Sequence, residues 1–100
     1  MISPLDAYNR NKTKTEETIS QIIENIDKTL VVYFKTITQE GFLVEVNYDL
    51  EDEHRRILYS NRFYIMQKIQ SKYLEKGWIV TQKNSNTLKF EIPNPKKYLF

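Results

Sequence analysis

One short run of polar residues, Glu51-Asp52-Glu53-His54, has the side chains needed for acid–base catalysis or for binding a metal ion. Carboxylates and imidazole are general acid–base groups, and both bind divalent metals. Adjacent residues of a helix point in different directions, however, whereas a metal site needs convergent ligands, for example at positions i and i+4. Acidic residues also suit the positive N-terminal end of a helix. We therefore interpret the run as the solvated start of a helix.

The sequence offers little for other kinds of catalysis. It has one histidine and no cysteine, and no serine lies in a recognisable nucleophile elbow. The absence of cysteine excludes disulfides and thiolate metal sites. With only two glycines, Gly41 and Gly77, there is no glycine-rich loop to hold a phosphate group. We expect a protein that is not an enzyme and needs no cofactor.

Basic side chains are concentrated in the second half of the chain. Residues 1–50 carry 5 basic and 8 acidic side chains (a net charge of −3), whereas residues 51–100 carry 10 and 5 (+5). Aromatic residues lie among these cations, and nucleic-acid-binding proteins combine cations that neutralise phosphates with rings that stack on bases. The cations that would form such a face are Arg55, Arg56, Arg62, Lys68, Lys72 and Lys76.

Two observations weigh against a nucleic-acid face. Most of the aromatic residues occupy helix-periodic or strand-alternating positions that a core needs, and no DNA- or RNA-binding motif is present. A solvated basic face is also the commoner reason for such a charge imbalance.

The elements that must position these residues follow from the hydrophobic pattern. Apolar residues recur every three or four positions from Ile19 to Ile37, which predicts a helix that continues to about Gln39 and ends at a left-handed cap, Gly41. Residues 30–37 are rich in β-branched and aromatic side chains and also fit a strand. We favour the helix because the apolar stripe keeps its phase through this region.

The start of this helix is less definite. Ser3 with Pro4 and Asp6 is a favourable helix start, but residues 9–18 contain no apolar side chain, and residues 13–16 offer a second capping box. Residues 1–18 therefore form either a helix that projects from the domain or a loose arm. A projecting helix usually lies on a partner, commonly a second copy of the chain.

A strand and a second helix follow. Residues 42–50 alternate between apolar and polar, which predicts a half-buried strand. The helix begins at the acidic residues 51–53, and Arg62, Lys68, Lys72 and Lys76 lie on or beside its solvated face. Its apolar side is predicted to contain Leu58, Phe63, Ile65, Met66, Ile69 and Tyr73.

The C-terminal part is predicted to be a hairpin. Gly77 ends the second helix in a Schellman-type stop, which places Trp78 against Tyr73 in a structural role. Residues 78–83 and 87–92 pair across a three-residue polar loop. Pro93 ends the last strand, and the tail that follows either folds back on its own core or docks on a neighbour.

These elements predict an α+β fold: a long N-terminal helix, a strand, a second helix and a C-terminal β-hairpin, with a small three-stranded antiparallel or mixed sheet covered by helices. A chain of 100 residues fits one domain, which we place at residues 1–92, with residues 93–100 as the tail. The longest apolar run, residues 30–34, is too short to cross a membrane, and the first residues do not fit a signal peptide. We expect a cytoplasmic protein without membrane contact.

With this layout the chain resembles a group of small proteins of tailed bacteriophages. The shared features are an opening like MISPLDAY, a long helix running to a glycine (Gly41), a strand like FLVEV, and a helix that ends in a GW or GY pair (Gly77 and Trp78) before a short hairpin. The likeness covers nearly all residues, but the segment NRNKTKTEET and the tail NPKKYLF depart from it. Most members have no assigned function, so the resemblance implies an accessory role and supplies no catalytic residue.

Two functional hypotheses follow. The first is a non-enzymatic accessory protein of phage type that binds further copies of itself or another viral or host protein, in the host cytoplasm or in the virion. Its contact candidates are residues near the two ends of the chain: Leu5, Tyr8, Tyr98, Leu99 and Phe100. The second is a small nucleic-acid or nucleotide-binding module that uses the six basic residues named above.

Overall fold

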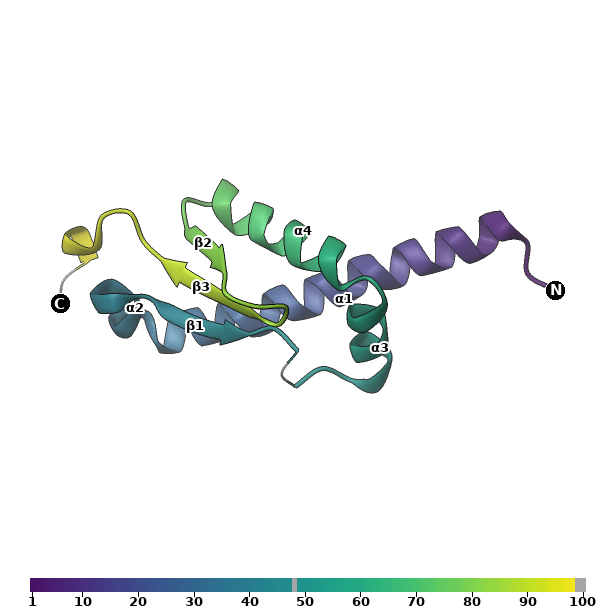
Figure 1. The fold of residues 1–100 in the computed structure, drawn as a ribbon, viewed down its shortest axis with the longest axis horizontal. Coiled ribbons are helices and arrows are strands. Elements are labelled where there is room, and N and C mark those ends of the chain that lie inside the picture. The colour runs from purple at the N-terminus through teal and green to yellow at the C-terminus, as the bar shows by residue number, and fades with distance from the viewer. Residues whose placement is uncertain (48, 99–100) are drawn as a thin grey trace.

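A computed structural model describes residues 1–47 and 49–98 and confirms the α+β fold (Figure 1). Tyr48, Leu99 and Phe100 lie outside the described residues. The elements, in chain order, are α1 (Pro4–Val32), α2 (Phe34–Glu40), β1 (Phe42–Glu45), α3 (Asp52–Ser60), α4 (Arg62–Glu75), β2 (Ile79–Gln82), β3 (Thr87–Glu91) and a short 3-10 helix (Pro95–Tyr98).

Helix α1 begins at the first of the two predicted starts. The Ser3 hydroxyl accepts a hydrogen bond from the Asp6 amide at 3.1 Å, and Pro4 occupies the first helical position. The helix then runs without a break to Val32 and spans much of the length of a molecule that measures 58 × 24 × 20 Å (Figure 1).

Residues 30–37 are helical except at one position. Tyr33, with φ −104° and ψ 20°, separates α1 from α2, and its ring stacks on Phe42 at 4.8 Å. Gly41 ends α2 as predicted, but it is not a left-handed cap. Its φ of 82° and ψ of 171° direct the chain straight into β1, in a region that is essentially restricted to glycine.

The sheet is antiparallel, with the strand order β1-β3-β2. The predicted hairpin is confirmed: β2 pairs with β3 in the register Val80 to Phe90, and the Lys83 amide donates to the Thr87 carbonyl at 2.9 Å. The strand predicted over residues 42–50 is shorter than expected, because β1 ends at Glu45. Val46 and Leu50 are nevertheless buried, so the alternating pattern continues into the turn.

The single second helix predicted from the sequence is wrong, because it is two helices, α3 and α4, separated at Asn61. The assignment of Phe63 to the apolar side is also wrong, since 75% of this residue is exposed. Phe63 precedes buried Ile65 by two positions, which turns its side chain about 200° around the helix.

The predicted Schellman stop at Gly77 is confirmed. The Trp78 amide donates to the Tyr73 carbonyl and the Gly77 amide to the Leu74 carbonyl, both at 3.1 Å. The Trp78 ring meets Phe90 at 6.0 Å and nearly perpendicular. Phe90 in turn contacts Tyr73 at 5.0 Å, so the tryptophan packs at the margin of the core.

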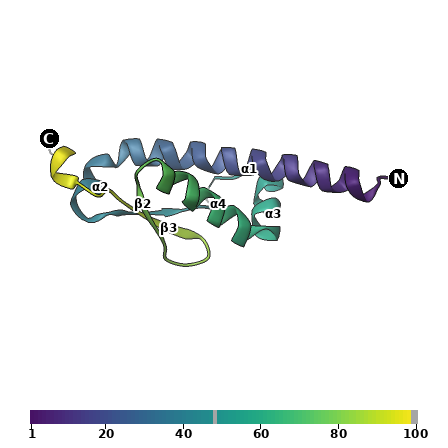
Figure 2. The same cartoon turned by 90° about the horizontal axis from the view of Figure 1, so that it is seen from above.

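Helices α1 and α4 cover one face of the sheet (Figure 2). Val44, Val80 and Phe90 point into this core, whereas Leu43 and Ile79 are exposed on the opposite face. The buried residues that α1, α4 and β3 contribute are Ile19, Ile22, Ile26, Leu30, Ile65, Met66, Ile69, Tyr73, Leu88 and Phe90.

The described part of the tail folds back on its own chain. Its short helix contacts α2, and the Tyr98 ring meets Phe34 edge-on at 5.6 Å. For residues 93–98, this arrangement favours a tail that folds back on its own chain over a tail that docks on a neighbour.

Candidate protein-contact surface

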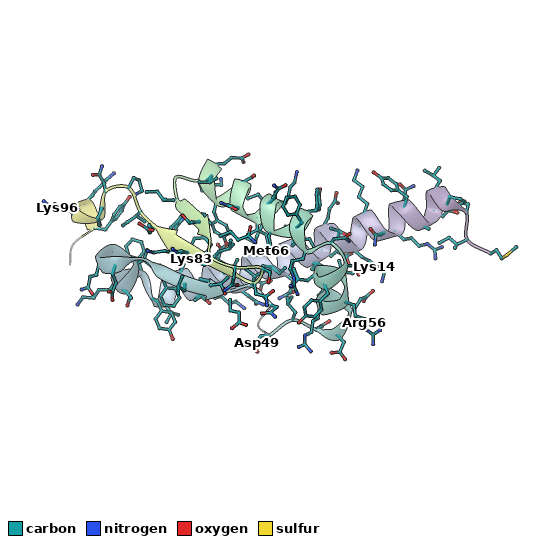
Figure 3. All side chains as sticks on the ribbon, in the orientation of Figure 1. Lys14, Asp49, Arg56, Met66, Lys83 and Lys96 are labelled. Carbon is teal, nitrogen blue, oxygen red and sulfur yellow. The ribbon has the colours of Figure 1, made fainter. Side chains whose placement is uncertain are left out.

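The first turns of α1 extend beyond the rest of the molecule (Figure 1). The body of the domain reaches along α1 only as far as Lys14 and Thr15. There, Lys14 forms an ion pair with Glu53 of α3, and the Asn61 side chain donates to the Thr15 hydroxyl at 3.4 Å. Figure 3 shows Lys14 at this point, beside α3. Residues 4–14 precede it and are all exposed.

The projecting segment places two apolar side chains in line with the stripe that packs the core, with the polar residues Lys12 and Thr15 between them and that stripe. Ile19 and Ile26 are buried. Leu5 occupies the same heptad position as these residues, two heptads before Ile19 and three heptads before Ile26. Tyr8 bears the same relation to Ile22. Eleven helical residues extend about 16 Å, since the rise is 1.5 Å per residue. The core-facing side of α1 therefore extends into a region where none of the described elements covers Leu5 and Tyr8.

Helix α4 begins next to this stripe and forms a step with it. A hollow of about 250 Å³ lies between the two helices. We call the surface formed by Leu5, Tyr8, Lys12, Asn61 and Tyr64 the ledge. The side chains that line the hollow are Tyr8, Asn11, Lys12, Thr15, Glu16, Asn61 and Tyr64.

The ledge exposes large apolar side chains. Leu5 is 67% exposed, Tyr8 62% and Tyr64 54%, and Tyr59 and Phe63 are also exposed on α3 and α4. Exposed apolar groups gathered on one surface are typical of protein contacts, and tyrosine is enriched at such interfaces because it combines an apolar ring with a hydroxyl group.

Hydrogen bonds and an ion pair hold the step in place. The Thr18 hydroxyl lies 2.9 Å from Nδ1 of His54 and donates to the Lys14 carbonyl. The hydrogen bond from Lys14 lowers the pKa of Glu53 below its ordinary value, and the positive charge of Lys14 acts in the same direction. The polar run at residues 51–54 thus joins α3 to α1. Within residues 1–47 and 49–98, no group of three His, Cys, Asp or Glu side chains is placed to hold a metal ion.

The contact residues predicted from the sequence lie at two ends of the molecule. Leu5 and Tyr8 are on the ledge, whereas Tyr98 is near the C-terminus, against α2 (Figure 1). Leu99 and Phe100 lie outside the described residues. Among the described residues, Leu5 and Tyr8 therefore do not share a surface with Tyr98.

The predicted basic face is also divided. Lys68 and Lys72 are exposed on α4 and Lys76 at its C-cap, at four-residue spacing, while Arg56 lies exposed on α3 (Figure 3). Two of the arginines already have partners. Arg55 contacts the Asp52 carboxylate at 3.6 Å and donates to the Leu50 carbonyl, and Arg62 lies over the Tyr59 ring at 4.7 Å.

Sequence reasoning did not place Asn61 and Tyr64 beside Tyr8, where they line the same hollow. Their placement depends on the break between α3 and α4, which brings the start of α4 up to Thr15 of α1. Asn61 itself is the available signal, because asparagine interrupts helices more readily than most residues.

No protein-family model, curated protein or solved structure matches this chain. None of the helices in the described part of the chain is both long and apolar enough to cross a membrane.

Proposed function

We propose that this chain is a non-enzymatic accessory protein of the phage type that acts through protein–protein contacts, and that the ledge is its main contact surface. The observation that carries the proposal is the projecting segment of α1, residues 4–14, which places Leu5 and Tyr8 in line with the core-facing stripe beyond the end of the body. The exposure of Leu5, Tyr8 and Tyr64 supports the same conclusion.

Most helical stability in proteins comes from packing one apolar face. The eleven residues before Thr15 lack that packing in the single chain. A partner that covers Leu5 and Tyr8 would supply it.

A second copy of the chain is the partner that we expect to cover the projecting segment. If two α1 helices run antiparallel, each projecting segment lies in the step of the other copy, and both apolar stripes are covered at once. Such a two-fold contact uses the same surface on both copies, as most homodimers do.

Light scattering of the purified chain tests this proposal. We expect the wild type to form an oligomer whose mass falls on dilution, and Tyr8→Asp to form a smaller oligomer or a monomer at the same concentration, because it places a charge on the covered side of α1. Thr13→Asp is the matched control, since Thr13 is exposed five positions further along α1 and does not line the hollow. A wild type that stays monomeric at high concentration, or equal effects of the two variants, would contradict the proposal.

A specific observation favours a second function, the binding of nucleic acid. Lys68 and Lys72 on α4 and Lys76 at its C-cap recur at i, i+4 and i+8 and so form one basic row. If they bind phosphates, the affinity for single-stranded DNA or RNA falls steeply with added salt, and replacing all three with glutamine flattens this dependence. A gel-shift titration at several salt concentrations measures both. An absent or salt-insensitive shift would remove this function.

A further inference from the structure

The two edges of the sheet are protected unequally. At the β2 edge, α4 lies alongside, and the Gln70 side-chain amide donates to the Val80 carbonyl at 2.9 Å. Thus a backbone group that would otherwise face an open edge has a partner. The β1 edge has no comparable cover among the described residues.

The hydrogen-bond pattern identifies the open groups of β1. The Val46 amide donates to the Asn86 carbonyl of the neighbouring chain segment at 2.7 Å. In an antiparallel pair, residues alternate between bonding the neighbour and pointing away from it. Val44 therefore bonds β3 like Val46, whereas the amide and carbonyl groups of Leu43 and Glu45 face the open edge.

A partly apolar hollow lies beside this edge. It has a volume of about 230 Å³ and lies between α1 and β1, where Ile22 and Ile26 face Val44 and Val46. The polar side chains at its margin are Asn25, Lys28, Thr29, Glu45 and Asp49. A free strand edge beside a helix-lined hollow is the arrangement that accepts an added strand: backbone bonds give affinity, and the hollow takes alternate side chains.

Side chains do not block the β1 edge either. Natural edge strands are commonly protected by lysine, proline or a bulge. Strand β1 reads Phe42-Leu43-Val44-Glu45, and Leu43 is 56% exposed. Val32, at the end of α1, is 73% exposed.

We propose that β1 pairs antiparallel with β1 of a second copy, with Leu43 opposite Glu45 of that copy, to form a continuous six-stranded sheet. In this register Leu43 and Glu45 of both copies exchange backbone hydrogen bonds, which satisfies the open groups identified above. The contact is separate from the ledge and does not depend on the proposed function.

Charge and backbone geometry select this register over its neighbours. Pairing Glu45 with Glu45 places like charges directly opposite each other, which is destabilising. Pairing Leu43 with Leu43 requires Gly41 to continue the strand, but the positive φ of Gly41 removes it from strand geometry. In the proposed register Lys89, which pairs with Leu43 within the chain, lies in one row with Glu45 of the second copy. Opposite charges thus flank Leu43 on the exposed face.

Cysteine cross-linking tests the contact and its register. The chain has no native cysteine, so every thiol is introduced, and positions 43 and 45 are exposed. Residues paired in this way lie about 5.5 Å apart, within the range of a disulfide. Equal amounts of L43C and E45C are mixed and oxidised gently, each in the Tyr8→Asp background so that ledge contacts do not contribute. T81C, an exposed position on β2, is the control.

We expect the mixed disulfide between positions 43 and 45 to exceed the sum of the two homodimeric disulfides, a ratio that random collision does not give. T81C should form no excess product with either variant. Dominant products of E45C with itself or L43C with itself would overturn the register. Random proportions, or no disulfide while the thiols remain reactive, would overturn the strand pairing.

Discussion

Tyr73 shows how one polar group fastens two helices. Its side chain is buried in α4, and its hydroxyl donates to the Asp27 carboxylate at 2.6 Å and lies 3.2 Å from the Ile23 carbonyl, both on α1. Tyr73→Phe removes this bond and keeps the ring. We expect the free energy of unfolding to fall by about 1 to 2 kcal/mol, the usual cost of losing such a hydrogen bond. Urea denaturation at neutral pH measures it, and an unchanged midpoint would contradict the role.

The same hydroxyl makes the stability of the folded state decrease at alkaline pH. Burial, and secondly the hydrogen bond to Asp27, raise the pKa of Tyr73 well above its ordinary value of about 10. The folded state therefore holds the proton more tightly than the unfolded state, so this stabilisation is complete below about pH 10 and is lost as the pH rises further. The stability difference between wild type and Tyr73→Phe should accordingly narrow above about pH 10, as urea denaturation from pH 7 to 11 would show.

The two glycines, Gly41 and Gly77, allow the effects of backbone strain and of steric contact to be compared. Both have positive φ, but a Cβ at Gly77 meets nothing within 4 Å, whereas at Gly41 it would lie 2.9 Å from Lys89 Cε and 3.3 Å from the Phe90 carbonyl oxygen. We expect Gly77→Ala to cost about 1 kcal/mol through backbone strain. Gly41→Ala should cost about 2 to 3 kcal/mol, because its backbone region is nearly closed to other residues. Equal shifts in thermal denaturation would contradict this ranking.

Among the elements, α1 differs along its length, because its projecting residues 4–14 contribute no buried side chain to the body. Deleting residues 1–10 leaves Asn11 as a favourable cap and every buried residue in place. We expect the shortened chain to fold, with a free energy of unfolding within about 1 kcal/mol of the Tyr8→Asp variant, because exposed helix ends contribute little. Urea denaturation followed by circular dichroism measures this. A chain that no longer unfolds cooperatively would show that residues 1–10 belong to the core.

Elements with strong local signals were the ones that the sequence predicted well. The stripe from Ile19 to Ile37, the stop at Gly77 and the three-residue hairpin loop each depend on contacts between near neighbours in the chain. The break at Asn61 depends instead on contacts between residues far apart in the chain. Helix α3 packs against α1 through His54 with Thr18 and through Glu53 with Lys14. The early end of β1 is likewise determined by its pairing with β3, which periodicity alone does not show.

At the scale of the whole molecule, the ledge and the β1 edge occupy different parts of an elongated shape (Figure 1). One chain could therefore contact two neighbours at the same time. Leu5 and Tyr8 were identified from the sequence because they are the apolar residues of a predicted projecting helix. Asn61 and Tyr64, on the other side of the ledge, were not identified, because their position depends on where α4 begins relative to α1.

The central claim, that this protein works through contacts with other protein chains, is tested most directly by native mass spectrometry of the protein purified gently from the cells that express it. The account predicts a defined oligomer of this chain with no additional mass. A monomer or small oligomer that retains nucleic acid or a nucleotide would contradict it and make the row of Lys68, Lys72 and Lys76 the functional site.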